Sequence, residues 1–198
     1  MNARLLAALS APALMMSVTA CGINTVPASE EVAKARWADV QAAYQRRANL
    51  IPNLVATVKG AAASEERILT QVTEARANAT RITVSGEQLS DPAAMARFNE
   101  AQARLSASII PLQRLQEQYP QLQSQGNFAT LMSQLEGTEN RINITIRDYN
   151  EAVRDYNTRI RTFPDMIGAK LVHGAKPLVP YQATTPNADQ APAVDFGK

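Results

Sequence analysis

Two glutamates stand close enough in the sequence to act together on a substrate. Glu136 and Glu139 lie three residues apart, which places their carboxylates on neighbouring parts of one helical face. Paired carboxylates of this kind serve as acid and base in glycoside hydrolysis. No sequence signal for a cleft accompanies them, and carboxylates on a helical surface are usually salt-bridge partners. We therefore predict no catalytic residue, and an enzyme acting on cell wall or lipid is the least favoured alternative.

The remaining patterns of catalytic chemistry are missing from the sequence. There is no Gly-x-Ser-x-Gly elbow and no glycine-rich phosphate loop, since Gly60 and Gly86 are isolated. The single histidine, His173, cannot supply the two Glu-x-x-His elements of a di-iron bundle. The formal net charge is +2, and no basic cluster interleaved with aromatic residues is present. We expect no metal, no cofactor and no nucleic-acid partner.

The single cysteine has its own chemistry. Cys21 follows an apolar run from Leu5 to Val18 and the small residues Thr19 and Ala20, which is the pattern of a bacterial lipobox. We predict a signal peptide over residues 1–20 and a lipidated Cys21 that carries diacylglycerol and an N-terminal acyl chain such as palmitate. The alternative is an ordinary signal peptide with a stray cysteine. The apolar run is too short for a comfortable membrane span, which needs about 20 residues.

Lipidation at Cys21 predicts the location of the chain. A single acyl chain binds a membrane only marginally, whereas two or three hold it there almost permanently. We expect a protein of the cell envelope, attached to the membrane through its lipid anchor. Gly22 after the cysteine favours the outer membrane facing the periplasm, and the inner membrane is possible.

The main structural element predicted is a long helix over residues 131–163. Residues 147–150, Arg-Asp-Tyr-Asn, recur seven residues later, and seven residues make two helical turns. Apolar residues alternate four and three apart, as in a buried helix seam. The predicted core seam is Ile142, Ile146, Tyr149, Val153, Tyr156, Ile160 and Phe163.

Two polar columns accompany this seam. Asn143, Asn150 and Asn157 form the asparagine column, although asparagine is a poor helix former. The simpler interpretation is that these amides hydrogen-bond to neighbouring helices and fix their register. The alternative is a polar groove that binds another molecule. Arg147, Arg154 and Arg161 form an outer column that we expect to face solvent.

The rest of the chain predicts an all-α, up-and-down bundle of long helices. Residues 21–28 read as a spacer before an N-cap at Ser29, residues 29–173 as the bundle, and residues 174–198 as a proline-rich extended tail. A turn between Gly60 and Ser64 gives four helices, which we favour, whereas a continuous helix gives three long ones and a short one. Pro52 predicts a kink near Ala48, where it frees a carbonyl.

Several motifs resemble the signature of the LemA family. They are the sequence EGTENRI at residues 136–142, the spacing of Tyr149, Asn150, Val153, Tyr156 and Asn157, the sequence RRANLIPNLV at residues 46–55, and the closing residues 194–196. The resemblance implies an all-helical envelope protein and no agreed biochemical activity. Most relatives keep an N-terminal transmembrane helix, from which the lipobox of this chain departs.

The candidate interaction or structural network combines these polar residues. It consists of Arg46, Arg47, Asn49, Asn53, Glu136, Glu139, Asn140, Arg141, Asn143, Asn150 and Asn157. We expect Arg46 or Arg47 to pair with Glu136 or Glu139, or to hydrogen-bond carbonyls freed by Pro52. The favoured function is a non-catalytic scaffold that contacts another envelope protein. The alternative is a receptor whose pocket for a peptide or small ligand lies around Pro52, facing residues 136–141.

Overall fold

The computed structural model describes residues 3–123 and 126–182, and every regular element within these ranges is helical. The predicted all-α class is thereby confirmed. The side chain of Cys21 and residues 183–198, with the expected closing motif at 194–196, lie outside the described part. The elements are α1 (Ala3–Ala61), η1 (Ala63–Glu65), α2 (Glu66–Arg81), η2 (Gly86–Ser90), α3 (Pro92–Gln118), α4 (Pro120–Gln123), α5 (Gly126–Arg159) and α6 (Asp165–Leu171).

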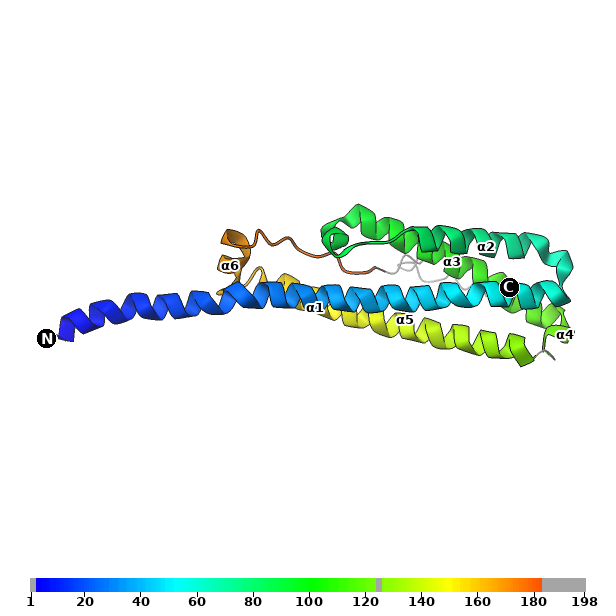
Figure 1. Ribbon diagram of the computed structural model, residues 1–198, viewed down its shortest axis with the longest axis horizontal. Helices are drawn as coiled ribbons and strands as arrows, with labels where there is room; N and C mark the ends of the chain where they lie inside the picture. The colour runs from blue at the N-terminus through cyan, green and yellow to red at the C-terminus, as the bar shows by residue number, and fades with distance from the viewer. Residues whose placement is uncertain (1–2, 124–125, 183–198) are drawn as a thin grey trace, which may run out of the picture.

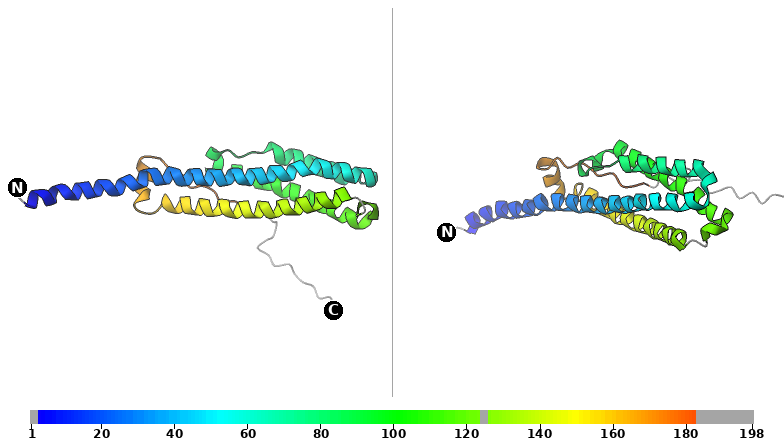
Figure 2. Two further views of the ribbon diagram at one scale, coloured as in Figure 1. Left: turned by 60° about the horizontal axis from the view of Figure 1, so that its bottom comes forward. Right: turned by 45° about the vertical axis from the view of Figure 1, so that its right-hand side comes forward.

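The helices are arranged as an elongated rod. Figures 1 and 2 show α1 and α5 side by side and antiparallel, with the α2–α3 hairpin packed along the half of the rod that is distant from the N-terminus. The long helices α1, α2, α3 and α5 alternate in direction, which is the up-and-down topology expected. At the opposite end, α6 packs beside α1, and α1 continues alone toward the N-terminus.

The turn near residue 60 selects the four-helix alternative. Helix α1 ends at Ala61, Ala62 leaves the helical region at φ −137° and ψ 58°, and α2 begins at Glu66. Ser64 makes no capping hydrogen bond there; its hydroxyl lies 3.1 Å from the Tyr119 hydroxyl. At the start of α3, the Asp91 carboxylate accepts a hydrogen bond from the Ala93 amide, so Asp91 caps the helix and Pro92 occupies its first turn.

The spacer predicted before residue 29 is wrong. Residues 21–28 are helical and belong to α1, and Ser29 lies inside that helix, donating a hydrogen bond to the Val26 carbonyl. Val26 and Ala33 are fully buried in the same apolar cluster as Ala169 of α6. Burying this face stabilises a continuous helix more than the local spacer and capping signals favour an interruption.

Two apolar clusters form the core. One, near α6, packs the ring of Trp37 at 5.1 Å from those of Phe98 and Tyr149, and the Trp37 indole donates to the Val84 carbonyl. The other fills the distal half between α1, α2, α3 and α5. None of the helices in the described residues combines the length and hydropathy that a membrane crossing requires.

The predicted seam of α5 is mostly buried, and it ends earlier than expected. Ile142, Tyr149, Val153, Tyr156 and Ile160 are buried, and Ile146 is half-buried. Phe163, by contrast, is 70% exposed, so its assignment to the core is wrong. Helix α5 ends at Arg159, and the turn that follows takes residue 163 out of the seven-residue register.

Candidate functional site

Two members of the asparagine column hold an extended segment of the chain itself. The side-chain carboxamide of Asn157 donates a hydrogen bond to the backbone carbonyl of Leu178 at 2.8 Å and accepts one from the backbone N–H of Leu178 at 2.9 Å. The side-chain carboxamide of Asn150 likewise donates to the backbone carbonyl of Tyr181 at 3.0 Å and accepts from the backbone N–H of Tyr181 at 2.8 Å. Each asparagine side chain thus pairs with one backbone residue in both directions. We call Asn150 and Asn157, with the residues they pair, the amide ladder.

The spacing of the ladder follows from two regular geometries. Seven residues of α-helix rise about 10.5 Å, and three residues of extended chain cover about 10 Å. A helix with asparagine every seven residues therefore matches an extended segment at every third residue. The carboxamide carries one acceptor and a donor group in a plane, as a peptide unit does. The asparagine column read from the sequence is consequently suited to hold the backbone of an extended polypeptide.

Further contacts fasten the same segment, residues 174–182, which we call the tail segment. The Val179 amide donates to the Leu89 carbonyl at 2.8 Å, and the Tyr149 hydroxyl donates to the Val179 carbonyl at 2.8 Å. The Asn99 amide donates to the Gln182 carbonyl at 3.1 Å. The Leu178 side chain is 5% exposed and belongs to the apolar cluster near α6. The segment therefore lies among α5, η2 and α3.

A pair of tyrosines adds a side-chain contact. The hydroxyls of Tyr44 and Tyr181 are hydrogen-bonded, and their rings are stacked with centroids 6.3 Å apart. Burial raises the pKa of Tyr44, Tyr149 and Tyr181 above the ordinary tyrosine value. These hydroxyls therefore stay neutral into the alkaline range where an exposed tyrosine ionises, and Tyr149 remains a donor to the tail segment there.

Arg47 joins three helices in the middle of the rod. Its guanidinium, from α1, donates to Glu139 of α5 at 2.9 Å and to Ser106 of α3 at 2.7 Å. It also donates to the side-chain oxygen of Gln102 at 2.8 Å and lies 4.9 Å from the centre of the Tyr44 ring. The side chain is only 1% exposed, so one charge is buried against a partly exposed carboxylate. The expected pairing of an α1 arginine with Glu139 is present.

The carbonyl freed by Pro52 finds a partner that the sequence did not indicate. Pro52 removes the hydrogen bond that would reach the Ala48 carbonyl four residues earlier. The Arg76 side chain of α2 donates to this carbonyl at 2.8 Å. Neither Arg46, which is exposed, nor Arg47 serves this role. The site of the predicted kink thus becomes a point where α2 is attached to α1.

Other members of the predicted network do not come together. Seven of them are exposed: Arg46, Asn49, Asn53, Glu136, Asn140, Arg141 and Asn143. Asn49 accepts a hydrogen bond from Gln45 on its own helix, and the Asn53 carbonyl accepts one from Thr57. Glu139 is engaged by Arg47 while Glu136 faces solvent, so the two carboxylates do not share one environment. Among the residues that the structure describes, no group of His, Cys, Asp and Glu is arranged to hold a metal ion.

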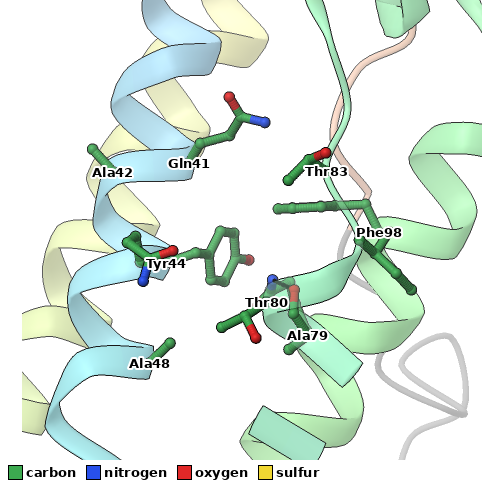
Figure 3. A pocket seen from close by; sticks show the side chains of 11 residues that line it. Gln41, Ala42, Tyr44, Ala48, Ala79, Thr80, Thr83 and Phe98 are labelled. Carbon is green, nitrogen blue, oxygen red and sulfur yellow. Dashed lines mark hydrogen bonds between the residues drawn. The ribbon is translucent and has the colours of Figure 1, made fainter. Parts of the chain in front are cut away.

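A cleft of about 290 Å³ lies between α1, α2 and α3. Figure 3 shows Tyr44 and Gln41 of α1 on one side, and Thr80 and Phe98 on the other. Pro52 and Glu136, around which the sequence predicts a pocket, do not line this cleft. The cleft is lined by polar, aromatic and aliphatic side chains, the last including Ala48 and Ile82.

Several residues of the site were missed by sequence reasoning. Leu178, Tyr181, Gln102, Ser106 and Arg76 carry contacts that bring distant parts of the chain together. The tail has little periodicity, and only the apolar residues among its prolines, such as Leu178 and Tyr181, hinted at docking. Gln102 lies four residues after Phe98 and three before Leu105, on the apolar face of its helix, and this spacing is a signal that it is buried. No comparable signal marks Ser106.

Comparisons with known proteins add one finding. Residues 36–196 match the family model described as LemA family. A search of the curated proteins finds no match. The matched range includes α5, the amide ladder, the tail segment and the C-terminal part of α1, from residue 36 onward.

Proposed function

Because the chain belongs to the LemA family, we propose that it is a non-catalytic interaction protein of the bacterial cell envelope. Its helical rod holds an extended polypeptide segment, and its partner is another envelope protein. The chain's own tail segment is the occupant seen in the structure. A partner segment binds either by displacing the tail or by continuing the same column at Asn143, which is exposed.

The observation that carries this proposal is the reciprocal pairing of Asn150 and Asn157 with backbone groups. Backbone hydrogen bonds give affinity for any extended segment, and apolar pockets for alternate side chains give specificity. Leu178, buried while its neighbours Pro177 and Pro180 are exposed, marks one such pocket. The ladder accordingly favours an extended segment with an apolar residue at one defined position.

A partner segment that displaces the tail segment must bind more favourably than the tail does. Each hydrogen bond contributes a net of about 0.5–1.5 kcal/mol, so the four ladder bonds are a modest barrier to displacement. The tail is covalently tethered, which gives it an effective concentration of the order of millimolar. A partner therefore needs added contacts, and these are available on the exposed outer column of Arg147, Arg154 and Arg161.

Attachment to the membrane is the second part of the proposal. Cys21 is lipidated after removal of residues 1–20, which tethers α1 and the rod to the membrane. Gly22 supports the outer membrane, facing the periplasm, as the preferred location. Metabolic labelling with a palmitate analogue tests this directly. Wild type is expected to incorporate the label, Cys21→Ser is expected not to, and an unlabelled wild-type protein would refute the anchor.

Crosslinking in intact cells tests the interaction role. A photo-crosslinking residue is placed at Asn143, next to the ladder, and in a control at Gln134, which is also exposed on α5 but belongs neither to the asparagine column nor to the outer arginine column. We expect envelope proteins to be captured at position 143, with a changed yield when Asn150→Ala and Asn157→Ala release the tail. Identical products at both positions, unaffected by the double variant, would contradict the proposal.

A receptor for a small ligand is the second candidate function. The cleft beside Tyr44 and Phe98 favours it, since its size is at the lower end of ligand pockets, about 300–1,000 Å³. Thr80→Trp would fill this cleft from the exposed side. A function that survives Thr80→Trp and fails in the ladder double variant would support the scaffold over the receptor.

A further inference from the structure

We infer that the end of the rod formed by residues 163–172 lies on the membrane as a second, non-covalent contact with lipid. This inference rests on the membrane attachment proposed above. Four large apolar side chains are exposed at this end, which we call the apolar end face: Phe163 at 70%, Ile167 at 36%, Leu171 at 81% and Val172 at 60%. An exposed apolar cluster of this kind marks an interaction site.

Helix α6 is built the opposite way to an ordinary surface helix. Its buried residues are the small Gly168 and Ala169, while the large Ile167 and Leu171 face outward. Ile167 and Leu171 are four residues apart and thus share one face of the helix. A helix that served only to cover the bundle would bury its large side chains. The arrangement fits a helix whose small residues pack against α1 and whose large apolar residues contact an apolar environment outside the protein.

The position of this face identifies lipid as its occupant. Figures 1 and 2 show α6 at the end of the rod where α1 leaves the bundle toward its apolar N-terminal run. Ala169 of α6 and Val26 of α1 belong to the same buried cluster. Val26 is five residues beyond Cys21, about 7.5 Å along the helix. The lipid anchor would therefore hold α6 within reach of the headgroups.

The charges around the face agree with an anionic membrane surface. Arg161 and Lys170 are exposed beside the apolar residues, and each adds a positive charge. Asp165, the one acidic residue between residues 160 and 173, lies 3.6 Å from Arg159 and is largely covered. Apolar side chains flanked by cations are the composition of interfacial segments that bind anionic lipids.

Depth-dependent quenching of a fluorescent probe tests the inference. The full, lipidated chain carries Leu171→Cys labelled with a nitrobenzoxadiazole group and is reconstituted in vesicles of phosphatidylethanolamine and phosphatidylglycerol. Lipidation of Cys21 leaves the new thiol as the only one to label. The matched control is Ile144→Cys, since Ile144 is also an exposed apolar residue, 42% exposed. Position 144 lies 15 residues before Arg159, where α5 ends, which is about 22 Å along the helix.

We expect the probe at position 171 to lose most of its fluorescence to a doxyl-labelled lipid and to shift its emission to the blue. The probe at position 144 is expected to remain unquenched. Vesicle flotation is measured on the same samples. A chain that floats with vesicles while neither probe is quenched would overturn the inference and leave the anchor intact. A chain that does not float would overturn both. An emission shift that depends on protein density, without quenching by lipid, would place a second copy on the face and overturn the inference.

Discussion

The side-chain amide of Asn157 and the backbone of Leu178 form two hydrogen bonds in opposite directions, at 2.8 and 2.9 Å. An asparagine in a helix normally weakens it, because its amide competes for backbone groups. Here the amide substitutes for a neighbouring strand and satisfies two backbone groups of a segment without secondary structure. The weak helix propensity of the asparagine column is compensated by contacts that no apolar residue could make.

Removing the ladder should release the tail segment. The double variant Asn150→Ala, Asn157→Ala loses four hydrogen bonds, each contributing about 0.5–1.5 kcal/mol, and should lower the free energy of unfolding by about 2–6 kcal/mol. Amide hydrogen exchange checks this residue by residue. Protection at Leu178 and Tyr181 should fall strongly. Asn143→Ala, in the same column but exposed, is the control and should leave both amides protected.

Replacing Arg47 should be far more damaging than replacing its partner. Arg47→Ala removes bonds to three side chains on two helices and leaves a cavity, so we expect a loss of about 3–5 kcal/mol. Glu139 is partly exposed and water can replace it, so Glu139→Gln should cost about 1 kcal/mol or less. Urea unfolding measures both. Equal losses would mean that the ion pair, rather than the contacts to α3, gives Arg47 its importance.

The helical architecture could be predicted because its signals are local. The seven-residue repeat specifies α5, and the turn expected between Gly60 and Ser64 separates α1 from α2. The tail segment has no such signal. Its docking depends on Leu178 and Tyr181 matching asparagines about twenty to thirty residues away, and a sequence column does not name its partner. The simpler interpretation, register between helices, is wrong for Asn150 and Asn157, which bind an extended segment.

The errors at the helix ends have a common cause. Ser29 has the residue type of an N-cap, and Phe163 continues the seven-residue register, yet each local pattern is overridden by its surroundings. Burial of Val26 carries α1 through the expected cap, and the turn after Arg159 ends α5 before Phe163. Boundaries depend on packing partners that periodicity does not contain.

A pair of aromatic substitutions measures where the core ends. Tyr149 is fully buried, packs on Trp37 and donates to the Val179 carbonyl, so Tyr149→Ala should cost about 3–5 kcal/mol. Phe163→Ala should cost less than about 1 kcal/mol, the range of surface substitutions. Thermal or urea unfolding distinguishes the two. A large loss for Phe163→Ala in the absence of membrane would show that this ring is covered in solution.

The stability of the fold should fall at alkaline pH, and buried tyrosines should cause part of that fall. Burial raises the pKa of Tyr44 and Tyr149 above the ordinary value of 10.0, so each is neutral in the folded chain at a pH where it ionises in the unfolded chain. Such a group contributes stability that is fully present below pH 10 and is lost as the pH rises toward the folded pKa. The expected slope is about 1.4 kcal/mol per pH unit for each tyrosine.

Lys34 contributes in the same direction, because the hydrogen bonds that its ammonium group donates to Glu31 and Glu30 raise its pKa above 10.5. Its contribution is likewise present at lower pH and lost as the pH rises. Unfolding by urea between pH 8 and pH 12 separates the groups. Tyr149→Phe should reduce the loss of unfolding free energy at alkaline pH by the contribution of one tyrosine. Lys34→Gln should leave the loss caused by the tyrosines unchanged. If Tyr149→Phe and wild type lost stability equally over this range, the Tyr149 hydroxyl would be ionising in the folded chain as readily as in the unfolded one. Its hydrogen bond to the Val179 carbonyl would then not hold the tail segment in solution.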